Sequence, residues 1–422
     1  MARPETHGTC HTKTSSLNAM RGKEGPMNQL HNLMDVISTK ENLLLAYRSA
    51  VKGKRYRQEV LIFKQDLEIN IDMLHDELTS DTYEVGPYRQ FYVVIPKTRL
   101  VMALHFRDRV VQWALYRQLN PYLDKRFIYD TYGCREGKGT LAAAERLLHW
   151  IRVVSRKPDH ENWFYLKLDI AKFFYRVDHE VMMDMMRDLT DDPRFLALMY
   201  RIINNPTVPF GLPEGIKAHD CPVEQRLFDV GMPIGNLSSQ MLANLYLDPL
   251  DKFCKHTLGI HYYIRYMDDI VILSNNVEEL LSIMNMIGEF LDKRLKLKLN
   301  SKTSIRPVKC GVEFVGYRIN ATGLRLRRST AKRIKRVLKH LSAEYAAGNI
   351  EISDIKPTLA SYFGIMKHCE SYNLRRWITE NISFCRGDRV GNDIPGIERL
   401  MEDDWYRHVD VMEEDISYEY TY

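Results

Sequence analysis

The sequence contains few cysteines, and no two of them stand in the C-x-x-C spacing of a structural zinc module. Its seven cysteines are an odd number scattered along 422 residues, which argues against a disulfide framework and favours a reducing, cytoplasmic setting. No apolar run approaches the roughly 18 residues that a membrane span needs. The stretch Met1–Lys23 is polar and lacks the apolar core of a secretory signal. We therefore expect neither export nor a membrane partner.

Acidic residues are in deficit over most of the chain. The formal net charge is +5, but residues 387–422 hold eleven Asp/Glu against three Arg, a net of −8 that leaves +13 for residues 1–386. Such a basic body predicts a polyanionic partner, for example nucleic acid. Hydrophobic residues make up 45% of the chain and charged residues 27%, a globular balance for roughly two to four folding units.

Carboxylates interrupt apolar strands at two places. Residues 163–170 predict a buried strand that ends on Asp169, and two later apolar stretches flank Asp268 and Asp269, which predicts a hairpin with both acids at its turn. Adjacent carboxylates between apolar strands repel each other and lose hydration unless a cation lies there. Hard oxygen ligands favour Mg²⁺ or Mn²⁺, and two such ions can activate a 3′-hydroxyl and stabilise a leaving pyrophosphate.

Other patterns predict local structure around these acids. Gln90–Leu104 predicts a pair of strands, and Val277–Leu291 an amphipathic helix. Leu295–Leu299 alternates Lys and Leu, which predicts a strand with one basic face. Residues 204–229 hold four of the sixteen prolines and predict a loop-rich insertion, and residues 355–385 predict a last pair of helices.

Five segments, taken together and in this order, resemble the motifs of a reverse transcriptase. They are Leu168–Phe174, Gly231–Gln240, Tyr266–Asp269, Leu299–Thr303 and Phe314–Tyr317. The likeness extends over roughly residues 40–380 and is greatest to prokaryotic enzymes of the group II intron-like radiation, above all those of diversity-generating retroelements and of antiphage defence. It implies an α+β right-hand polymerase fold, with fingers, an antiparallel palm sheet and a helical thumb.

The resemblance also implies a division of the chain. The expected parts are a flexible N-terminal arm (1–38), N-terminal helices and fingers (39–160), a palm with the insertion near 204–229 (161–312), a primer grip and helical thumb (313–386), and an acidic C-terminal tail (387–422). No nuclease module is expected after the thumb. The length of the insertion departs from the diversity-generating enzymes.

Residue roles carry over from the matching motifs. Asp169, Asp268 and Asp269 would be catalytic and hold two Mg²⁺ ions, with Mn²⁺ as a substitute and the Ile170 carbonyl as an extra ligand. Phe174 would be the sugar gate, whose ring excludes a ribose 2′-hydroxyl. The other nucleotide-binding residues would be Lys97, Arg99, Arg135, Gln240 and Lys302.

Basic residues predict contacts to the nucleic-acid backbone in two places. Eight of them, with no acid among them, lie between Ala321 and Ser342, where unopposed like charge favours an anionic neighbour. They are Arg325, Arg327, Arg328, Lys332, Arg333, Lys335, Arg336 and Lys339. Lys54, Arg55 and Arg57 form a second group around Tyr56, a potential stacking surface. The primer grip would be formed by Phe314, Gly316 and Tyr317.

Several alternatives stay open. The protein is interpreted as an RNA-directed DNA polymerase, against a catalytically silent RNA-binding scaffold or an RNA-dependent RNA polymerase. Its expected partners are a cognate template RNA, the cDNA–RNA duplex and dNTPs, with a small accessory protein and self-association as further hypotheses. Mutagenic diversification and antiphage defence both remain open as its purpose. The primer could be RNA, DNA or a tail tyrosine such as Tyr422.

Overall fold

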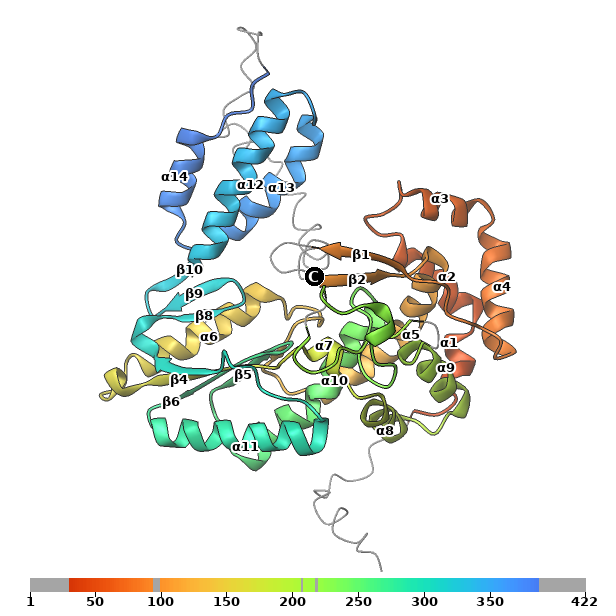
Figure 1. Ribbon diagram of the computed structural model, residues 1–422, viewed down its shortest axis with the longest axis horizontal. Coiled ribbons are helices and arrows are strands. Elements are labelled where there is room, and N and C mark those ends of the chain that lie inside the picture. The colour runs from red at the N-terminus through yellow and green to blue at the C-terminus, as the bar shows by residue number, and fades with distance from the viewer. Residues whose placement is uncertain (1–29, 94–98, 206–207, 217–218, 387–422) are drawn as a thin grey trace, which may run out of the picture.

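A computed structural model describes residues 30–93, 99–205, 208–216 and 219–386. The first part of the chain is helical and is interrupted by an antiparallel ribbon of two strands (Figure 1). Its elements are α1 (Leu33–Ile37), α2 (Lys40–Ala50), α3 (Gln58–Gln65), α4 (Leu67–Thr79), β1 (Arg89–Val93), β2 (Arg99–Ala103) and α5 (Phe106–Arg126). The ribbon confirms the strand pair predicted over Gln90–Leu104.

Helix α2 illustrates why these segments are helical. The Thr39 hydroxyl accepts a hydrogen bond from the Asn42 amide and so caps the helix, and Leu43, Ala46 and Ala50 recur on one buried face. This face packs against α5, which forms the centre of the helical part.

The end of the predicted N-terminal arm is packed rather than flexible. Leu33, Met34 and Ile37 of α1 are buried, and the Met34 amide donates to Asp192 Oδ2 at 2.9 Å. The assignment of residues 30–38 to a flexible arm was therefore wrong, because three closely spaced apolar side chains provide enough surface to dock a single turn. The remainder of the arm, residues 1–29, and the acidic tail lie outside the described residues.

A five-stranded sheet forms the centre of the molecule, in the order β3-β5-β6-β4-β7. The strands are β3 (Thr131–Tyr132), β4 (Phe164–Asp169), β5 (Tyr263–Tyr266), β6 (Asp269–Ser274) and β7 (Ser304–Pro307). All pairs are antiparallel except β3 with β5. The sheet thus confirms the predicted hairpin and the strand before Asp169.

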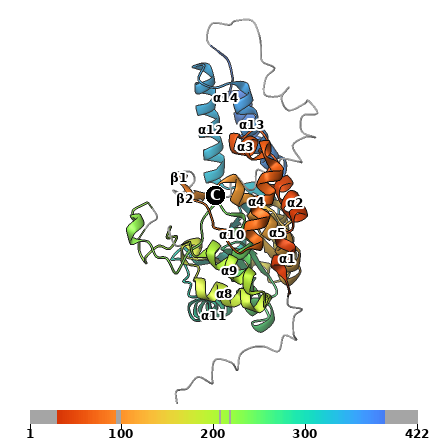
Figure 2. The same cartoon turned by 90° about the vertical axis from the view of Figure 1, so that its right-hand side faces the viewer.

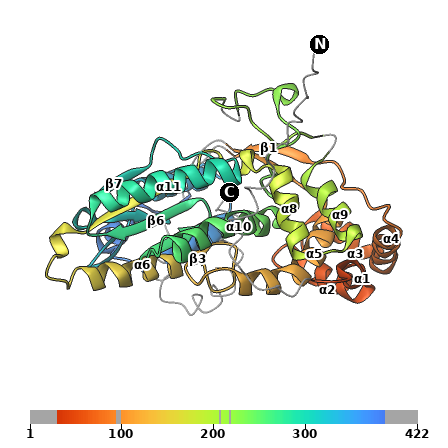
Figure 3. The same cartoon turned by 90° about the horizontal axis from the view of Figure 1, so that it is seen from below.

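Both faces of this sheet are buried, which explains the unbroken apolar run in β6. Ile270 and Ile272 face a core shared with α10 (Leu237–Lys252) and α11 (Val277–Leu295), whereas Val271 and Leu273 face a core shared with α6 (Thr140–Val154). Figure 3 shows α10 and α11 lying across the first of these faces. Because β3 and α6 belong to this unit, it begins before residue 161, the predicted start of the palm.

A small sheet and three helices follow. The strands β8 (Val312–Phe314), β9 (Tyr317–Asn320) and β10 (Gly323–Leu326) pack on α6 and share its core. The helices α12 (Arg328–Ala346), α13 (Ile352–Lys367) and α14 (Tyr372–Asn381) enclose a separate core and stand apart from the central sheet in Figure 1. The last helical pair predicted within residues 355–385 is thereby confirmed.

Three helices and a long connection lie between β4 and α10. The helices are α7 (Phe173–Arg176), α8 (His179–Leu189) and α9 (Pro193–Ile203). In residues 208–216 and 219–229 the only helical turn is η3 (Val223–Gln225), and Figure 2 shows this segment projecting from the body of the molecule. It agrees with the predicted loop-rich insertion. None of the helices in the described ranges combines the length and the apolar character needed to cross a bilayer.

One predicted strand is absent from the described residues. Helix α11 continues to Leu295, where the Leu297 amide bonds back to the Leu291 carbonyl and Lys296 adopts a φ of 51°. Beyond it, Leu299 forms a single bridge with Ile170. The prediction of a strand over Leu295–Leu299 was therefore wrong, because the helix-ending turn takes the residues whose Lys–Leu alternation imitates a strand.

His179, at the start of α8, makes stability depend on pH. The ring is 4% exposed and its Nε2 donates to the Gly231 carbonyl at 2.6 Å, and burial lowers the pKa of His179. The unfolded chain takes up a proton near the ordinary pKa of about 6.5, whereas the folded chain resists it. As the pH is lowered from about 6.5, we expect the free energy of unfolding to decrease, with this group contributing at most about 1.4 kcal/mol per pH unit.

Denaturant unfolding at pH 7.5, 6.5 and 5.5 measures this dependence. In His179→Gln, whose amide can still donate to Gly231 but cannot titrate, the slope should be shallower. An unchanged slope would show that His179 does not contribute.

Candidate active site

The structure brings two of the three predicted carboxylates face to face. Asp169 is the last residue of β4 and Asp269 the first of β6, and the two are direct partners across the antiparallel pair. Asp268 lies beside them in the turn of the β5–β6 hairpin, after Met267, which adopts a φ of 52°. The hairpin thus presents adjacent acids at the end of strand β4.

Asp269 has an environment that fits a cation. Burial, above all, raises the pKa of Asp269 to about 6; the Lys167 ammonium opposes the rise, and the charges of Asp268 and Asp169 add to it. Lys167 Nζ lies 3.0 Å from Asp269 Oδ2, while Asp269 Oδ1 is buried without a hydrogen-bond partner. An orphaned carboxylate oxygen next to two further acids is a position that a divalent ion would satisfy.

The carboxylates are held apart by polar neighbours. The Asn300 side chain donates to Asp169 Oδ2 at 2.9 Å, and the Asn300 amide donates to the Asp169 carbonyl at 2.7 Å. Ile170 is buried next to it, at the bridge to Leu299. Within the described ranges no three His, Cys, Asp or Glu side chains already form a coordination cluster. A cation bound by Asp169 and Asp269 would compete with the present contacts from Asn300 and Lys167.

A buried ion pair, which the sequence did not reveal, supports the turn. Arg265 is fully buried and donates through Nε and Nη2 to the two carboxylate oxygens of Asp251, at 2.7 and 2.6 Å. Its Nη1 donates to the Met267 carbonyl at 3.0 Å and to Asn244 Oδ1 at 3.1 Å. The guanidinium therefore ties the turn that carries Asp268 to helix α10. A lone Arg in an apolar strand was the only sequence signal for this role.

Phe174 and Gln240 lie in the elements that adjoin the acids. Phe174 is half-buried in α7, edge-on to Phe173 with ring centroids 5.4 Å apart, and its carbonyl accepts from the Met232 amide at 2.7 Å. Gln240 is buried in the first turns of α10, where its Oε1 lies 3.4 Å from Cys134 Sγ. Lys302 is exposed in the turn after Asn300.

The loop before α10 is bonded to the ribbon of strands β1 and β2. The Met102 amide donates to the Ile234 carbonyl at 2.8 Å. Gly235 follows with a φ of 120°, and a Cβ there would lie 2.9 Å from the Met102 carbonyl oxygen. Only glycine permits both this conformation and this approach. Lys97 lies outside the described residues, and Arg99 occupies the first position of β2.

The Arg135 side chain is engaged by the end of α5 and the turn before β3. Its Nε donates to Asp124 Oδ1 at 2.6 Å, and its two Nη atoms donate to the carbonyls of Asp124, Ile128 and Thr131. The side chain is 6% exposed. These contacts hold the guanidinium at the turn before β3, so the nucleotide-binding role predicted for Arg135 would require them to break.

The predicted primer grip forms a tight hairpin between β8 and β9. Phe314 and Tyr317 are direct partners and are buried, so their side chains support the hairpin from inside. Val315 and Gly316 form its turn, with φ values of 42° and 88°. A β-branched residue rarely adopts such a φ, which marks this turn as strained. Lys167 Nζ also donates to the Glu313 carbonyl at 2.7 Å, which joins this hairpin to the carboxylates.

Half of the predicted basic cluster lies along one face of α12. The exposed members Arg328, Lys332, Arg336 and Lys339 recur at helical spacing. Lys339 also lies over the Trp377 ring, 5.5 Å from its centroid. The other four members have partners or are partly covered: Arg325 pairs with Glu370, Arg327 lies 3.1 Å from Glu313, Lys335 lies over the Trp377 ring, and Arg333 is half-buried. Lys54, Arg55 and Arg57 occupy the connection between α2 and α3, where Tyr56 is 77% exposed.

Comparison with known proteins gives one family and several distant relatives. The family model described as "Reverse transcriptase (RNA-dependent DNA polymerase)" matches residues 94–319, a range that holds all three carboxylates. The chain is 23% identical over 367 residues to the putative COX1/OXI3 intron 2 protein of Saccharomyces cerevisiae, covering 70% of this chain and 40% of that protein. It is 25% identical over 294 residues to protein YkfC of Escherichia coli, covering 60% of this chain and 72% of YkfC.

The chain is also similar to a bacterial intron-encoded protein and to a solved telomerase structure. Group II intron-encoded protein LtrA of Lactococcus lactis is 24% identical over 189 residues, covering 44% of this chain and 28% of LtrA. The chain thus spans less than half the length of the yeast protein and of LtrA. Telomerase from Candida tropicalis, solved with a TWJ fragment of telomeric RNA, superposes with a TM-score of 0.44 and 12% identity, covering 82% of this chain and 61% of telomerase.

Proposed function

Because the chain belongs to the reverse transcriptase (RNA-dependent DNA polymerase) family and has the right-hand polymerase fold, we propose that it synthesises cDNA on a dedicated RNA template by two-metal nucleotidyl transfer. The observation that carries this proposal is the pairing of Asp169 with Asp269 beside Asp268, with one oxygen of Asp269 buried and unsatisfied. A scaffold that only bound RNA would have no use for repelling carboxylates held in register.

The three carboxylates and the Ile170 carbonyl would hold the divalent cations. When bound there, Mg²⁺ or Mn²⁺ would stabilise the negative charge that develops on the phosphoryl group during its transfer. The chain contributes the strand register that faces Asp169 toward Asp269, and the Arg265 contact that fixes the turn carrying Asp268. Lys167, which now donates to Asp269, would give up that bond to a cation and would keep its second hydrogen bond, to the Glu313 carbonyl.

The incoming nucleotide would lie between the β1–β2 ribbon and the carboxylates. Arg99 at the start of β2 and Lys97, which precedes it in the sequence outside the described residues, would neutralise its triphosphate, and Gln240 would shape the pocket around the templating pair. Lys302 would stabilise the leaving pyrophosphate. Phe174 would oppose the 2′ position of the sugar and so select deoxynucleotides.

Phe174→Ala tests this gate. Removal of the ring should admit the ribose 2′-hydroxyl and raise the efficiency of ribonucleotide incorporation relative to deoxynucleotide by about 10- to 200-fold, the range a pocket achieves through shape alone. Steady-state kcat/KM for dGTP and GTP on one primer–template measures it. The control Phe174→Tyr keeps the ring and should keep the selectivity, whereas equal selectivity in the Ala variant would contradict the gate.

Nucleic acid would follow the exposed face of α12 and the connection that holds Lys54, Arg55 and Arg57. We propose a cognate template RNA, its duplex with cDNA and dNTPs as partners, with a small accessory protein and self-association as further elements. All six cysteines in the described ranges are free thiols, which supports a cytoplasmic setting. Diversification and antiphage defence are both compatible with the family.

Primer extension by purified protein on an RNA template, with Mg²⁺ and either dNTPs or NTPs, tests the function. Extension with dNTPs supports the proposal, and extension with NTPs alone would replace it by an RNA-dependent RNA polymerase. Sequencing of the RNA that copurifies with the protein identifies the template. It also decides between the two biological roles, because a template-repeat RNA indicates diversification.

A further inference from the structure

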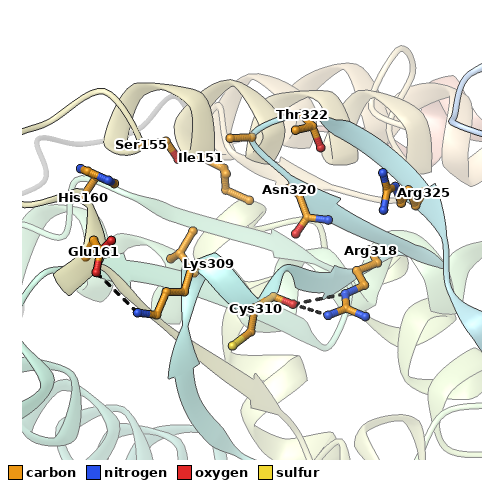
Figure 4. A pocket seen from close by; sticks show the side chains of 12 residues that line it. Ile151, Ser155, His160, Glu161, Lys309, Cys310, Arg318, Asn320, Thr322 and Arg325 are labelled. Atoms are coloured by element: carbon orange, nitrogen blue, oxygen red, sulfur yellow. Dashed lines mark hydrogen bonds and ion pairs between the residues drawn. The ribbon is translucent and has the colours of Figure 1, made fainter.

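A cavity of about 640 Å³ lies at the far end of the central sheet from the carboxylates. Its wall is formed by α6, by the turns η2 (His160–Asn162) and η5 (Val308–Cys310), and by β9 and β10 (Figure 4). The turn η2 precedes the start of β4, whereas Asp169 ends that strand, about 17 Å away at the ordinary rise of a strand. The cavity is therefore separate from the proposed polymerase site.

Three cationic side chains line this cavity, and the fold fixes the central one. Arg318 donates through Nε and Nη2 to the Cys310 carbonyl. Gly311 adopts a φ of 81°, which favours glycine, and a Cβ there would lie 2.9 Å from Arg318 Nε and 2.3 Å from Asn320 Oδ1, so a larger residue would displace both side chains. Figure 4 shows Arg318 and Asn320 on the same wall of the cavity.

The neighbouring acids pair with other cations and leave Arg318 without an ion pair among the described residues. Lys309 lies 3.8 Å from Glu161, and Arg325 pairs with Glu370 at 2.7 Å. Glu313 faces Arg318 across the β8–β9 pair but lies 3.1 Å from Arg327, and the hydrogen bonds of the Arg318 guanidinium go to the Cys310 carbonyl. A guanidinium held in this way is suited to a phosphate, which it can meet with two parallel hydrogen bonds.

A second cavity extends the first. It measures about 380 Å³, shares Thr322 with its neighbour and is lined by Arg152, Lys367 and His368. Across the two cavities five Lys and Arg side chains stand against three Glu, an excess of two positive charges. Ile151, Val308 and Ala321 supply an apolar floor in the larger one. Cations beside apolar side chains suit a single strand, because its phosphates and its bases need different neighbours.

We propose that these two adjoining cavities form a groove that binds a single-stranded segment of the RNA partner, outside the stretch being copied. The proposal rests on the proposed function for the presence of an RNA partner. A strand is favoured over a free nucleotide because the cations continue past the larger cavity into the second. The groove would hold the template RNA to the enzyme while the copied stretch moves through the polymerase site.

Chemical labelling of Cys310 tests the proposal in the unaltered protein. Cys310 is exposed and lines the larger cavity, and Cys385, exposed at the end of the helical region, serves as the reference. Maleimide labelling is followed by peptide mass spectrometry, with a 20-nucleotide single-stranded RNA or with AMP. RNA should slow labelling of Cys310 at least about 5-fold relative to Cys385, and AMP should not. The proposal would be overturned if Cys310 were labelled at the same rate with and without RNA, or if AMP but not RNA protected Cys310.

A charge variant gives a second, independent readout. Lys309→Gln/Arg318→Gln removes two groove cations, and the matched control Arg187→Gln/Lys293→Gln removes two exposed cations on α8 and α11. Affinity for the single-stranded RNA should fall about 10-fold, and the slope of log K against log salt should become shallower by about 1.4, the value for two single-strand phosphates. The control should keep both.

Primer extension separates this proposal from the proposed function. On a primer–template too short to reach the groove, the groove variant and the unaltered protein should extend the primer at the same rate. If no protein extends any primer but the groove variant still loses RNA affinity, the groove stands and the polymerase assignment fails. If extension is normal and RNA affinity is unchanged, the groove proposal fails alone.

Discussion

Asp269→Asn should abolish primer extension while leaving the fold intact. The change neutralises the carboxylate that has one oxygen buried without a partner, so the site would lose a proposed metal ligand worth several kcal/mol of transition-state stabilisation, on the order of 10³ in rate. The backbone pairing of residue 269 with Tyr266 and Asp169 does not depend on the carboxylate, and thermal unfolding should therefore be nearly unchanged.

The matched control is Asp184→Asn, which alters an exposed aspartate of α8 that pairs only with Arg187. It should retain full extension. Primer extension in Mg²⁺ and in Mn²⁺, with a thermal melt of each protein, measures both effects. Activity of Asp269→Asn within 10-fold of the unaltered protein would contradict the proposed role of the carboxylate.

Arg265→Met should produce the largest loss of stability. Asp251 would keep its two hydroxyl donors, Thr131 and Tyr263, but would lose the guanidinium that pairs with it in a fully buried position. Removing one partner of a buried pair costs about 3–5 kcal/mol, because an uncompensated charge is left behind. Denaturant unfolding followed by tryptophan fluorescence measures the loss, and Arg187→Met, at an exposed site, should stay within about 0.5 kcal/mol.

The double change Arg265→Met/Asp251→Leu separates stability from positioning. It removes both charges and should recover much of the lost stability, because apolar side chains of similar size can replace a buried pair. Primer extension should stay low, since the Met267 carbonyl still lacks its donor from Arg265. Recovery of both properties would show that the pair serves stability alone.

The residue types and the order of the candidate site could be predicted from the sequence, but not its arrangement. Apolar runs ending on acids placed Asp169 and Asp269 at strand ends, and the alternation of a strand puts Lys167 on the same face as Asp169. Asp169 and Asp269 face each other because β4 pairs with β6, a strand about a hundred residues later in the sequence. Local sequence patterns do not specify such a pairing. The partner of Arg265 depends on how α10 packs beneath the sheet.

The incorrect predictions have a common cause. Residues 30–38 were predicted to belong to a flexible arm, but the Met34 amide bonds to Asp192 at the start of α9. Lys–Leu alternation over Leu295–Leu299 resembles a strand, but those residues follow a helix whose end they complete. In each case a neighbouring element supplied the hydrogen bonds that decided the local structure, and that neighbour is invisible to a pattern only a few residues long.

The hydrogen bond between the Met102 amide and the Ile234 carbonyl couples the β1–β2 ribbon to the loop before α10. Any displacement of β2 toward the carboxylates must either break this bond or carry the loop before α10 with it. That loop leads into Asn236, which begins the helix bearing Asn244 and Asp251, the residues that hold Arg265 under the Met267 turn. A continuous series of hydrogen bonds and covalent links therefore joins the ribbon to the turn that carries Asp268, so a displacement of the ribbon is transmitted to the acids.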